Sequence, residues 1–476
     1  MNLYQTFKEA AFRYPRKTAV VQGKQAVSYQ ELEAIVSGIA SDLRQLGVAP
    51  GQMIGLCFGN SIAYIALTYA LWRLDAAVVP VDAESKPEEI RRICEQMQLD
   101  GMIQQSNGDA GWIPGKCPVI GTGYYFRGLQ QQSRGKPGMH IAFVRFTSGT
   151  TGSRKGVVLS HERILQRIQA VNKVLQIDCK DSILWTMSMS HHFVSTIVLY
   201  LSMGATIVLA QSIWSSSLLK LIQQTRVSLI YASPFHYSLL AADQSGLMMP
   251  PVRLAISTAA GLPREVQEGF LSRFQLPLVQ AYGIIETGLV CINTEDPQAK
   301  PDSVGQVLPD YKLHIANQQT YSRLGGLESG ELYFSGPGFF EAYFKPWMEE
   351  GQTLQQGWFE TGDIGTLDKD GFLYLQARKD HVINMAGIKI FPQEVEAELN
   401  GHPAVKESCV FGKAHDRWGQ VVAAKVVLQG AGPKLEPGEL KSFCRSRLAA
   451  YKVPEKIEFI SQIQKTRTTG KIIRPQ

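Results

Sequence analysis

The chain has 476 residues, too many for one hydrophobic core of ordinary size, and its 45% hydrophobic and 19% charged residues are typical of a soluble globular protein. No run of about 18 apolar residues occurs, and the first residues do not resemble a signal peptide, so we expect neither a membrane span nor export. The seven cysteines are scattered without metal-ligand spacing, which indicates reduced thiols in a cytoplasmic protein.

The formal net charge of +6 comes from the C-terminal end. Residues 445–476 contain eight Lys or Arg and two Asp or Glu, and the rest of the chain has 40 of each sign. Such a run is either a solvated basic face or a surface for a phosphate-bearing partner. The chain has no nucleic-acid-binding motif with interleaved aromatic residues, so we expect no DNA or RNA partner.

Helices and strands alternate through the N-terminal half. Residues 30–46 have apolar positions at helical spacing, and residues 61–74 also read as a helix. Residues 53–58 and 76–81 are apolar runs typical of buried strands, and a similar alternation recurs over residues 206–262. Strand, helix and strand in this order predict parallel α/β sheets.

The pattern changes twice toward the C-terminus. Residues 322–370 are rich in Gly and short β-like runs, which predicts a smaller β-rich lobe. After residues 377–380 a helix begins at Pro392, with acidic residues in its early turns. We therefore expect a large N-terminal domain over residues 1–379, containing the α/β sheets and the β-rich lobe. A small α+β domain over residues 380–476 should follow.

One loop has the residues needed to bind phosphate. The segment FTSGTTGSRKGV (146–157) follows an apolar strand and places five hydroxyl residues and two glycines before Lys155. Glycines allow close backbone approach, and backbone N–H groups and hydroxyls donate to phosphate oxygens. Gly156 after the lysine excludes the GxxxxGK[ST] loop, and by itself the segment is also compatible with a flexible linker.

This loop resembles the phosphate-binding signature of the adenylate-forming superfamily, which includes acyl-CoA synthetases, aryl-CoA ligases, peptide-synthetase adenylation domains and luciferases. Further motifs resemble that family in the same order along nearly the whole chain: residues 29–56, QAYGIIETG (280–288), GWFETGDIG (357–365), residues 377–396, residues 417–428 and TTGKI (468–472). The resemblance implies a two-domain α/β fold with a mobile C-terminal domain. It also implies an enzyme that uses ATP and Mg²⁺ to form an acyl-AMP.

The resemblance assigns roles to the matched residues. ATP or AMP would contact Thr147, Ser148, Gly149, Thr150, Thr151, Gly152, Lys155, Tyr282, Gly283, Asp363 and Arg378. Glu286 would bind Mg²⁺ together with Thr150, because this hard cation commonly bridges a carboxylate and phosphates. Asp363 would accept the ribose hydroxyls.

Lys471 is the catalytic residue that the resemblance implies most strongly. The reaction joins a carboxylate to an α-phosphate, and a cation between them stabilises charge on the pentacoordinate phosphorus. Three departures from the family pattern occur: Ile285 replaces a motif threonine, Ala377 replaces a glycine, and a proline is missing before TTGK. Thr287 is a candidate to replace the lost hydroxyl.

The resemblance places the acid between residues 187–196 and the segment STAAGL (257–262). Expected acyl contacts are His191, Phe193, Thr258, Ala259 and Ala281. Residues 183–242 contain no Asp or Glu, whereas an enzyme that activates amino acids usually places an acidic residue here. We therefore expect a neutral, apolar or aromatic carboxylic acid.

The resemblance also implies a thiol acceptor, with contacts at the matched positions Gly387, Trp418, Tyr451 and Lys452. Coenzyme A is the favoured acceptor, and a phosphopantetheinyl carrier protein is the alternative. A luciferase-like oxygenase and a non-catalytic nucleotide-binding relative are further alternatives. Asp380 is the expected hinge about which the small domain rotates between the two half-reactions.

Overall fold

The computed structural model describes residues 2–83, 85, 87–105, 119–120, 124–129, 140–146, 156–316, 329–344, 348–385, 388–416, 418–430, 435–465 and 472–475. The chain divides into two compact units: the first comprises Met1–Pro301, Leu308–Tyr311 and Gly336–Gln355, and the second comprises Asp302–Val307, Lys312–Ser335 and Gln356–Gln476. Within the described ranges, no helix combines the length and the apolar character needed to cross a membrane.

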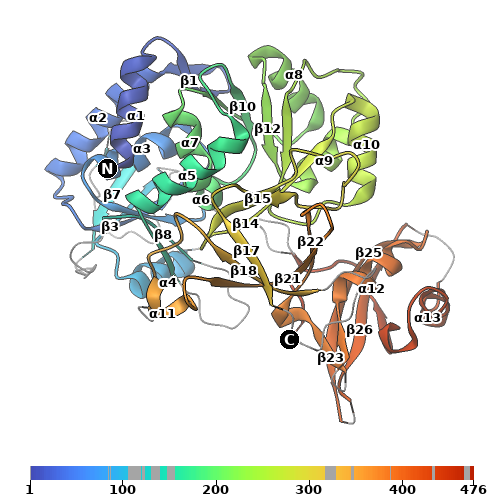
Figure 1. The fold of residues 1–476 in the computed structure, drawn as a ribbon. Coiled ribbons are helices and arrows are strands. Elements are labelled where there is room, and N and C mark those ends of the chain that lie inside the picture. Colours follow the sequence, from blue (N-terminus) through green and yellow to red (C-terminus); the bar gives the residue numbers. More distant parts are fainter. Residues whose placement is uncertain are drawn as a thin grey trace. The chain divides into compact units, whose positions relative to one another are not determined.

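The first unit contains two large sheets with parallel cores (Figure 1). One sheet has the order β15 (Gly288–Ile292), β14 (Leu278–Ile284), β13 (Leu254–Ser257), β12 (Leu229–Ala232), β10 (Ser182–Trp185), β11 (Thr206–Leu209), β1 (Thr18–Gln22) and β2 (Gln25–Ser28). Strands β14 to β1 pair in parallel along this path, and the hairpins β14–β15 and β1–β2 are antiparallel. The carboxyl ends of the parallel strands therefore lie along one edge.

The second sheet of this unit has the order β20 (Met348–Glu349), β19 (Ala342–Phe344), β9 (Gly156–Ser160), β8 (Ile141–Phe146), β4 (Ala77–Val81), β3 (Met53–Cys57), β5 (Gly101–Gln105), β7 (Tyr124–Gly128) and β6 (Val119–Ile120). Strands β3 and β4 pair in parallel, as the strand–helix–strand pattern predicts. The helix between them is α3 (Ile62–Arg73), close to the range expected from the sequence.

Helices cover the sheets through their apolar faces. They are α1 (Leu3–Arg13), α2 (Tyr29–Gln45), α4 (Pro87–Met97), α5 (His161–Leu175), α6 (Met189–His192), α7 (Ile197–Ser202), α8 (Ser215–Thr225), α9 (Pro234–Ala241), α10 (Arg264–Phe274) and α11 (Glu350–Thr353). Figure 1 shows α8, α9 and α10 beside β12. In this region Leu219, Tyr237 and Phe270 pack with Leu184 and Ile230 of the sheet in one buried cluster. The burial of these apolar side chains stabilises the packing of the helices on the sheet.

The second unit contains two smaller sheets. The first has the order β17 (Lys312–Ala316), β18 (Gly330–Ser335), β21 (Phe359–Leu367) and β22 (Leu373–Arg378), which matches the β-rich lobe expected from the sequence. The other joins β24 (Ile388–Ile390), β23 (Ile383–Met385), β26 (Gly419–Leu428) and β25 (Val405–His415), with β27 (Lys456–Phe459) beside β26. Helices α12 (Pro392–Asn400) and α13 (Pro437–Arg445) complete this part.

The mixed α/β class expected from the sequence is confirmed. The predicted domain boundary between residues 379 and 380 lies inside the second unit, between β22 and β23, and stays a prediction. Phe391 shares a buried apolar cluster with Ile364 of β21 and Ala377 of β22. This packing is one physical reason why the β-rich lobe and the C-terminal sheet form one compact unit.

Candidate active site

The predicted acyl residues and the Glu286 motif meet at one edge of the first unit's parallel sheet. His191 and Phe193 follow β10, Thr258 and Ala259 follow β13, and Ala281 lies within β14. Ligands of parallel α/β sheets bind at the carboxyl ends of the strands. The topology thus brings these separate segments of the sequence to a location suited to small-molecule binding.

Glu286 lies in the tight turn between β14 and β15. A side chain at Gly283 would collide with the carbonyl oxygen of Gly288, so the two strands can approach this closely only with glycine at position 283. The Tyr343 hydroxyl donates to Oε1 of Glu286 at 3.0 Å. The backbone N–H of Phe340 donates to the Glu286 carbonyl at 2.8 Å. The carboxylate is therefore oriented by β19 and by the segment before it.

Arg167 also holds this turn, and the sequence analysis did not identify it. Its guanidinium donates to the carbonyl oxygens of Ile285 at 2.8 Å, Glu286 at 2.5 Å and Gly338. The side chain is 3% exposed, and burial lowers its pKa to about 10. A signal did exist, because Arg167 lies beside Ile168 and one turn after Ile164 on the apolar face of α5.

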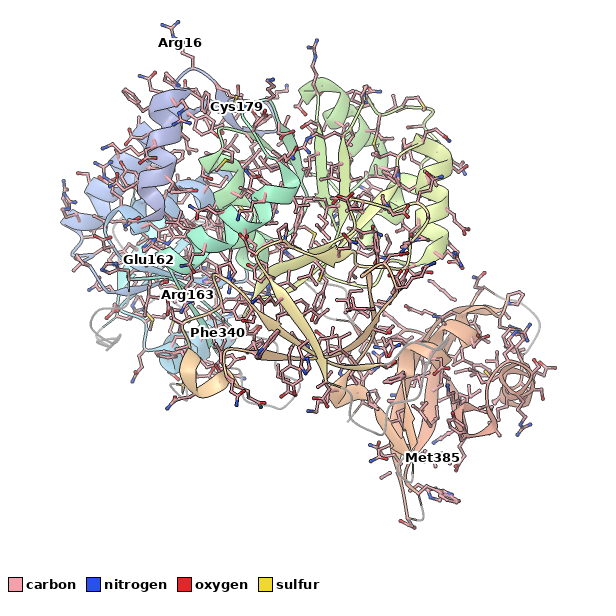
Figure 2. The ribbon with its side chains drawn as sticks, viewed as in Figure 1. Arg16, Glu162, Arg163, Cys179, Phe340 and Met385 are labelled. Carbon is pink, nitrogen blue, oxygen red and sulfur yellow. The ribbon has the colours of Figure 1, made fainter. Side chains whose placement is uncertain are left out.

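The neighbouring helix turn provides a useful contrast. Arg163 also belongs to α5, and Figure 2 labels it near Phe340. Its Nε donates to Glu341 Oε1 at 3.2 Å, and the Ser160 hydroxyl donates to the same oxygen at 2.6 Å. Arg163 therefore anchors the segment before β19 through a carboxylate, whereas Arg167 binds backbone carbonyls.

Glu286 fits the predicted Mg²⁺. The ion needs few protein ligands when phosphates and water supply the remaining oxygens, so one oriented carboxylate is a suitable contribution. No group of three or more His, Cys, Asp or Glu arranged to hold a metal exists among the residues that the structure describes. Thr287, the candidate replacement for the motif threonine, is fully buried and donates to the Gly288 carbonyl at 3.1 Å. Its role toward phosphate stays a prediction.

Several predicted residues lie outside the described ranges: Thr147, Ser148, Gly149, Thr150, Thr151, Gly152, Lys155, Gly387 and Lys471.

Arg145 precedes the phosphate loop in β8 and is a second cation that the sequence analysis missed. It donates to the His191 carbonyl at 2.6 Å, and burial lowers its pKa to about 10. Arg145 thereby connects the strand that leads into the loop with the predicted acyl segment.

Tyr231, at the end of β12, lies beside the predicted acyl segments. Its hydroxyl lies 3.4 Å from Nδ1 of His192, and the carbonyl of Ala232, the next residue, accepts the backbone N–H of Thr258 at 3.2 Å. Burial raises the pKa of Tyr231 to about 12, so the phenol is neutral. Trp185 stacks on its ring with centroids 5.4 Å apart. The end of β12 therefore lies between the segments that follow β10 and β13.

Other predicted acyl residues differ in their surroundings. Phe193 has no exposed surface and packs against Tyr64 and Trp72, with ring centroids 5.6 and 5.9 Å apart. This packing gives Phe193 a core position, and its contact with the acid stays a prediction. Ala259 has φ +74°, a conformation that costs energy for a residue with Cβ and that clusters at functional sites.

Asp363 and Arg378 are partners in the second unit. They are opposite residues of β21 and β22, and Arg378 Nη1 donates to Asp363 Oδ1 at 3.1 Å. The same nitrogen donates to the Thr361 carbonyl at 3.1 Å. The structure thus brings together two residues predicted to bind the nucleotide, and their ribose and phosphate contacts stay predictions.

The predicted hinge follows this pair. Lys379 Nζ lies 2.9 Å from Glu331 Oε2 and 2.8 Å from Glu360 Oε1, and these carboxylates raise its pKa. Asp380 lies in the short 3-10 turn Lys379–His381, and its side chain lies outside the described set. Lys379 is thus anchored to the β-rich lobe immediately before Asp380.

The described residues predicted to contact the thiol acceptor belong to the C-terminal sheet and its helices. Trp418 is 46% exposed in the turn between β25 and β26. Tyr451 and Lys452 form the 3-10 turn before β27, and Lys452 is buried with its ammonium bonded to Glu394 of α12. In this conformation the ammonium interacts with a carboxylate within the domain, and its role toward a thiol acceptor stays a prediction.

Comparisons with known proteins cover the whole chain. Residues 7–344 match the AMP-binding enzyme family, and residues 394–471 match the AMP-binding enzyme C-terminal domain. A 2-succinylbenzoate–CoA ligase of Bacillus cereus is 28% identical, covering 98% of this chain and 96% of the relative. A feruloyl-CoA synthase of Amycolatopsis sp is also 28% identical, covering 97% and 95%.

A solved structure shows the same fold. The o-succinylbenzoate CoA synthetase of Bacillus subtilis, in complex with its acyl-adenylate intermediate, superposes with a TM-score of 0.84. The two sequences are 24% identical, and the match covers 100% of this chain and 97% of that chain. The fold of this chain is therefore the fold of that protein.

Proposed function

The chain belongs to the AMP-binding enzyme family, and from this premise we propose that it is an ATP-dependent acid–thiol ligase. A carboxylic acid attacks the α-phosphate of ATP to give an acyl-AMP and pyrophosphate. The thiol of coenzyme A then attacks the acyl carbonyl, and AMP leaves. This is the reaction type that the motifs of the sequence predict.

The observation that carries the proposal is the extent of the match. Both family domains occur in order, and curated relatives that are CoA ligases align along 97–98% of this chain. The site residues that the structure describes are compatible with this chemistry. Glu286 is oriented by Tyr343 and Arg167, and Asp363 faces Arg378.

The proposed first half-reaction uses charge at both ends of the nucleotide. Glu286 would hold Mg²⁺, which offsets the negative charge of the phosphates when bound. Asp363 would accept ribose hydroxyls, and Arg378 would be held beside it. Lys471 would lie between the acid carboxylate and the α-phosphate and stabilise the charge that develops there.

The proposed second half-reaction needs the thiol at the same carbon that Lys471 approaches in the first. The domain of residues 380–476 would therefore rotate about Asp380 between the steps. Gly387, Trp418, Tyr451 and Lys452 would then form contacts to coenzyme A. The basic excess in residues 445–476 is suited to the phosphates of coenzyme A.

Coenzyme A is favoured over a carrier protein because the curated relatives are CoA ligases. The acids of these relatives fall into two chemical classes, since 2-succinylbenzoate has a second carboxylate and ferulate does not. The proposal places the reaction in the cytoplasm without a nucleic-acid partner.

A panel of aryl and aliphatic acids tests the proposal. ATP–pyrophosphate exchange should depend on the acid and on Mg²⁺ but not on coenzyme A. Addition of coenzyme A should then convert the acid into its thioester with one AMP per turnover. If the acyl group is transferred only to a phosphopantetheinyl carrier protein, that protein is the acceptor instead of coenzyme A. Light emission in the presence of oxygen would favour the oxygenase. If no acid supports exchange, the ligase proposal is wrong.

A further inference from the structure

A cavity of about 370 Å³ opens at the sheet edge that also carries the predicted acyl residues. Its walls come from three strand ends: Thr186 follows β10, Gln211 and Trp214 follow β11, and His236 belongs to α9 after β12. The volume is within the range of pockets that take small ligands. None of these wall residues belongs to the motifs used for the nucleotide.

The end of β12 connects this cavity with the predicted acyl segments. Thr186 Oγ1 donates to the Tyr231 carbonyl at 3.4 Å. The hydroxyl of the same tyrosine lies 3.4 Å from His192 Nδ1, and the next residue, Ala232, accepts the Thr258 N–H through its carbonyl at 3.2 Å. The cavity wall and the acyl segments are therefore adjacent through Tyr231 and Ala232. This position is suited to the end of the acid that lies away from the reacting carboxylate.

The polar groups in the walls of the cavity are uncharged. The walls contain hydroxyl and amide groups at Thr186, Gln211 and Ser212, and no Lys, Arg, Asp or Glu lines the cavity among the described residues. His236 accepts or donates through Nδ1 with the Ser233 hydroxyl at 2.9 Å. Burial lowers the pKa of His236 to about 4, so the ring is neutral near pH 7. A charged group inside would meet no opposite charge.

The rim of the cavity is apolar and aromatic. Trp214 is 72% exposed and Ile213 is 51% exposed, and Phe235, which precedes the lining residue His236 but does not itself line the cavity, is 55% exposed. Phe235 contacts the His236 ring with centroids 5.7 Å apart. A flat apolar group that packed on Trp214 would remove exposed aromatic surface from water, which favours binding.

We propose that this cavity binds the distal end of the acid and selects a neutral aromatic group, so that the enzyme prefers acids with a single carboxylate. The inference rests on the proposed ligase function and assigns a substrate class to it. A second carboxylate would lose its hydration and gain no cation. A neutral hydroxyl, amide or ring N–H would find partners at Gln211 and Ser212.

Two acids of equal shape test the inference. Cinnamic acids with a para carboxamide or a para carboxylate differ in distal charge alone. The ratio of their kcat/KM values in ATP–pyrophosphate exchange should favour the carboxamide by about 10- to 100-fold, because the carboxylate would lie partly desolvated without a partner. Equal values, or a preference for the carboxylate, would overturn the inference.

Two variants test whether the preference for the carboxamide acid arises in the cavity. Gln211→Lys should shift the ratio by at least about tenfold toward the para carboxylate, because the new ammonium supplies the missing cation. Gln223→Lys is the matched control, since Gln223 lies on α8 outside the cavity lining and bonds with the Met248 carbonyl. The inference fails if the two variants shift the ratio equally.

Trp214→Ala provides an independent measurement of the rim. It should raise KM for the carboxamide acid by about tenfold with kcat little changed, because the lost contact is made equally in the ground state and transition state. An unchanged KM would remove the rim from the site. If none of the tested acids supports pyrophosphate exchange by the unmodified enzyme, the ligase proposal itself fails. If acids support exchange but the carboxamide and carboxylate acids react equally well, only the inferred substrate class is wrong.

Discussion

Arg167→Met removes the guanidinium that holds the Glu286 turn. Methionine keeps much of the aliphatic volume of the arginine, so the change mainly deletes the donors to Ile285, Glu286 and Gly338. We expect a loss of both stability and Mg²⁺-dependent adenylation. The reason is that a buried side chain of α5 fixes the backbone on either side of the Glu286 carboxylate.

The expected loss of stability follows from the carbonyl acceptors that lose their donor. The Glu286 carbonyl still receives the Phe340 N–H, so Ile285 and Gly338 are the two carbonyls that lose the donor described for them. An unsatisfied buried carbonyl costs about 1–3 kcal/mol, and relief of the buried charge offsets part of the sum. We expect a decrease of about 3 kcal/mol in the free energy of unfolding. A shift of the carboxylate by about 1 Å would reduce adenylation by roughly 10²-fold.

Urea unfolding and pyrophosphate exchange at increasing Mg²⁺ measure the two effects separately. Arg163→Met is the matched control on the same helix, because its partner Glu341 keeps the Ser160 hydroxyl and a partly exposed ion pair contributes at most about 1 kcal/mol. Arg167→Lys keeps the charge but cannot reach three carbonyls, so its values should be intermediate. Equal stability and equal Mg²⁺ dependence for the Arg167→Met and Arg163→Met variants would refute this reasoning.

Three further predictions address catalysis, domain motion and pH. Lys471→Ala should reduce acyl-AMP formation by about 10²–10³-fold with unfolding unchanged, and undiminished pyrophosphate exchange would remove Lys471 from catalysis. Asp380→Pro fixes φ near about −65° and should slow thiol transfer from preformed acyl-AMP far more than adenylation; equal losses in both steps would exclude the hinge. His161 accepts the Leu3 N–H through Nδ1 at 3.2 Å, and burial lowers its pKa to about 4. An unfolded histidine has a pKa of about 6.5 and binds a proton first, so stability should fall as pH drops from about 6.5 to about 4, and His161→Gln should flatten this slope in urea titrations.

Local pattern and collinear motifs were sufficient for the elements and the family. The apolar spacing of residues 30–46 is realised in α2, and the apolar runs at residues 53–58 and 76–81 are realised in β3 and β4. These features depend on neighbouring residues, so a one-dimensional pattern contains them. The same holds for Glu286 and Asp363, because their motifs identify them without any knowledge of their partners.

The partners of these residues required the tertiary structure. Arg167 donates to the carbonyl of Ile285, 118 residues later in the chain, and Lys452 donates to Glu394 of another element. The packing of Phe193 against Tyr64 of α3 was likewise not readable from the sequence, and its contact with the acid stays a prediction. The neutral cavity likewise exists only because the order of β10, β11 and β12 brings three separate strand ends together. Sequence determines which groups are available, but sheet order and burial decide which of them meet, since both depend on contacts between residues far apart in the chain.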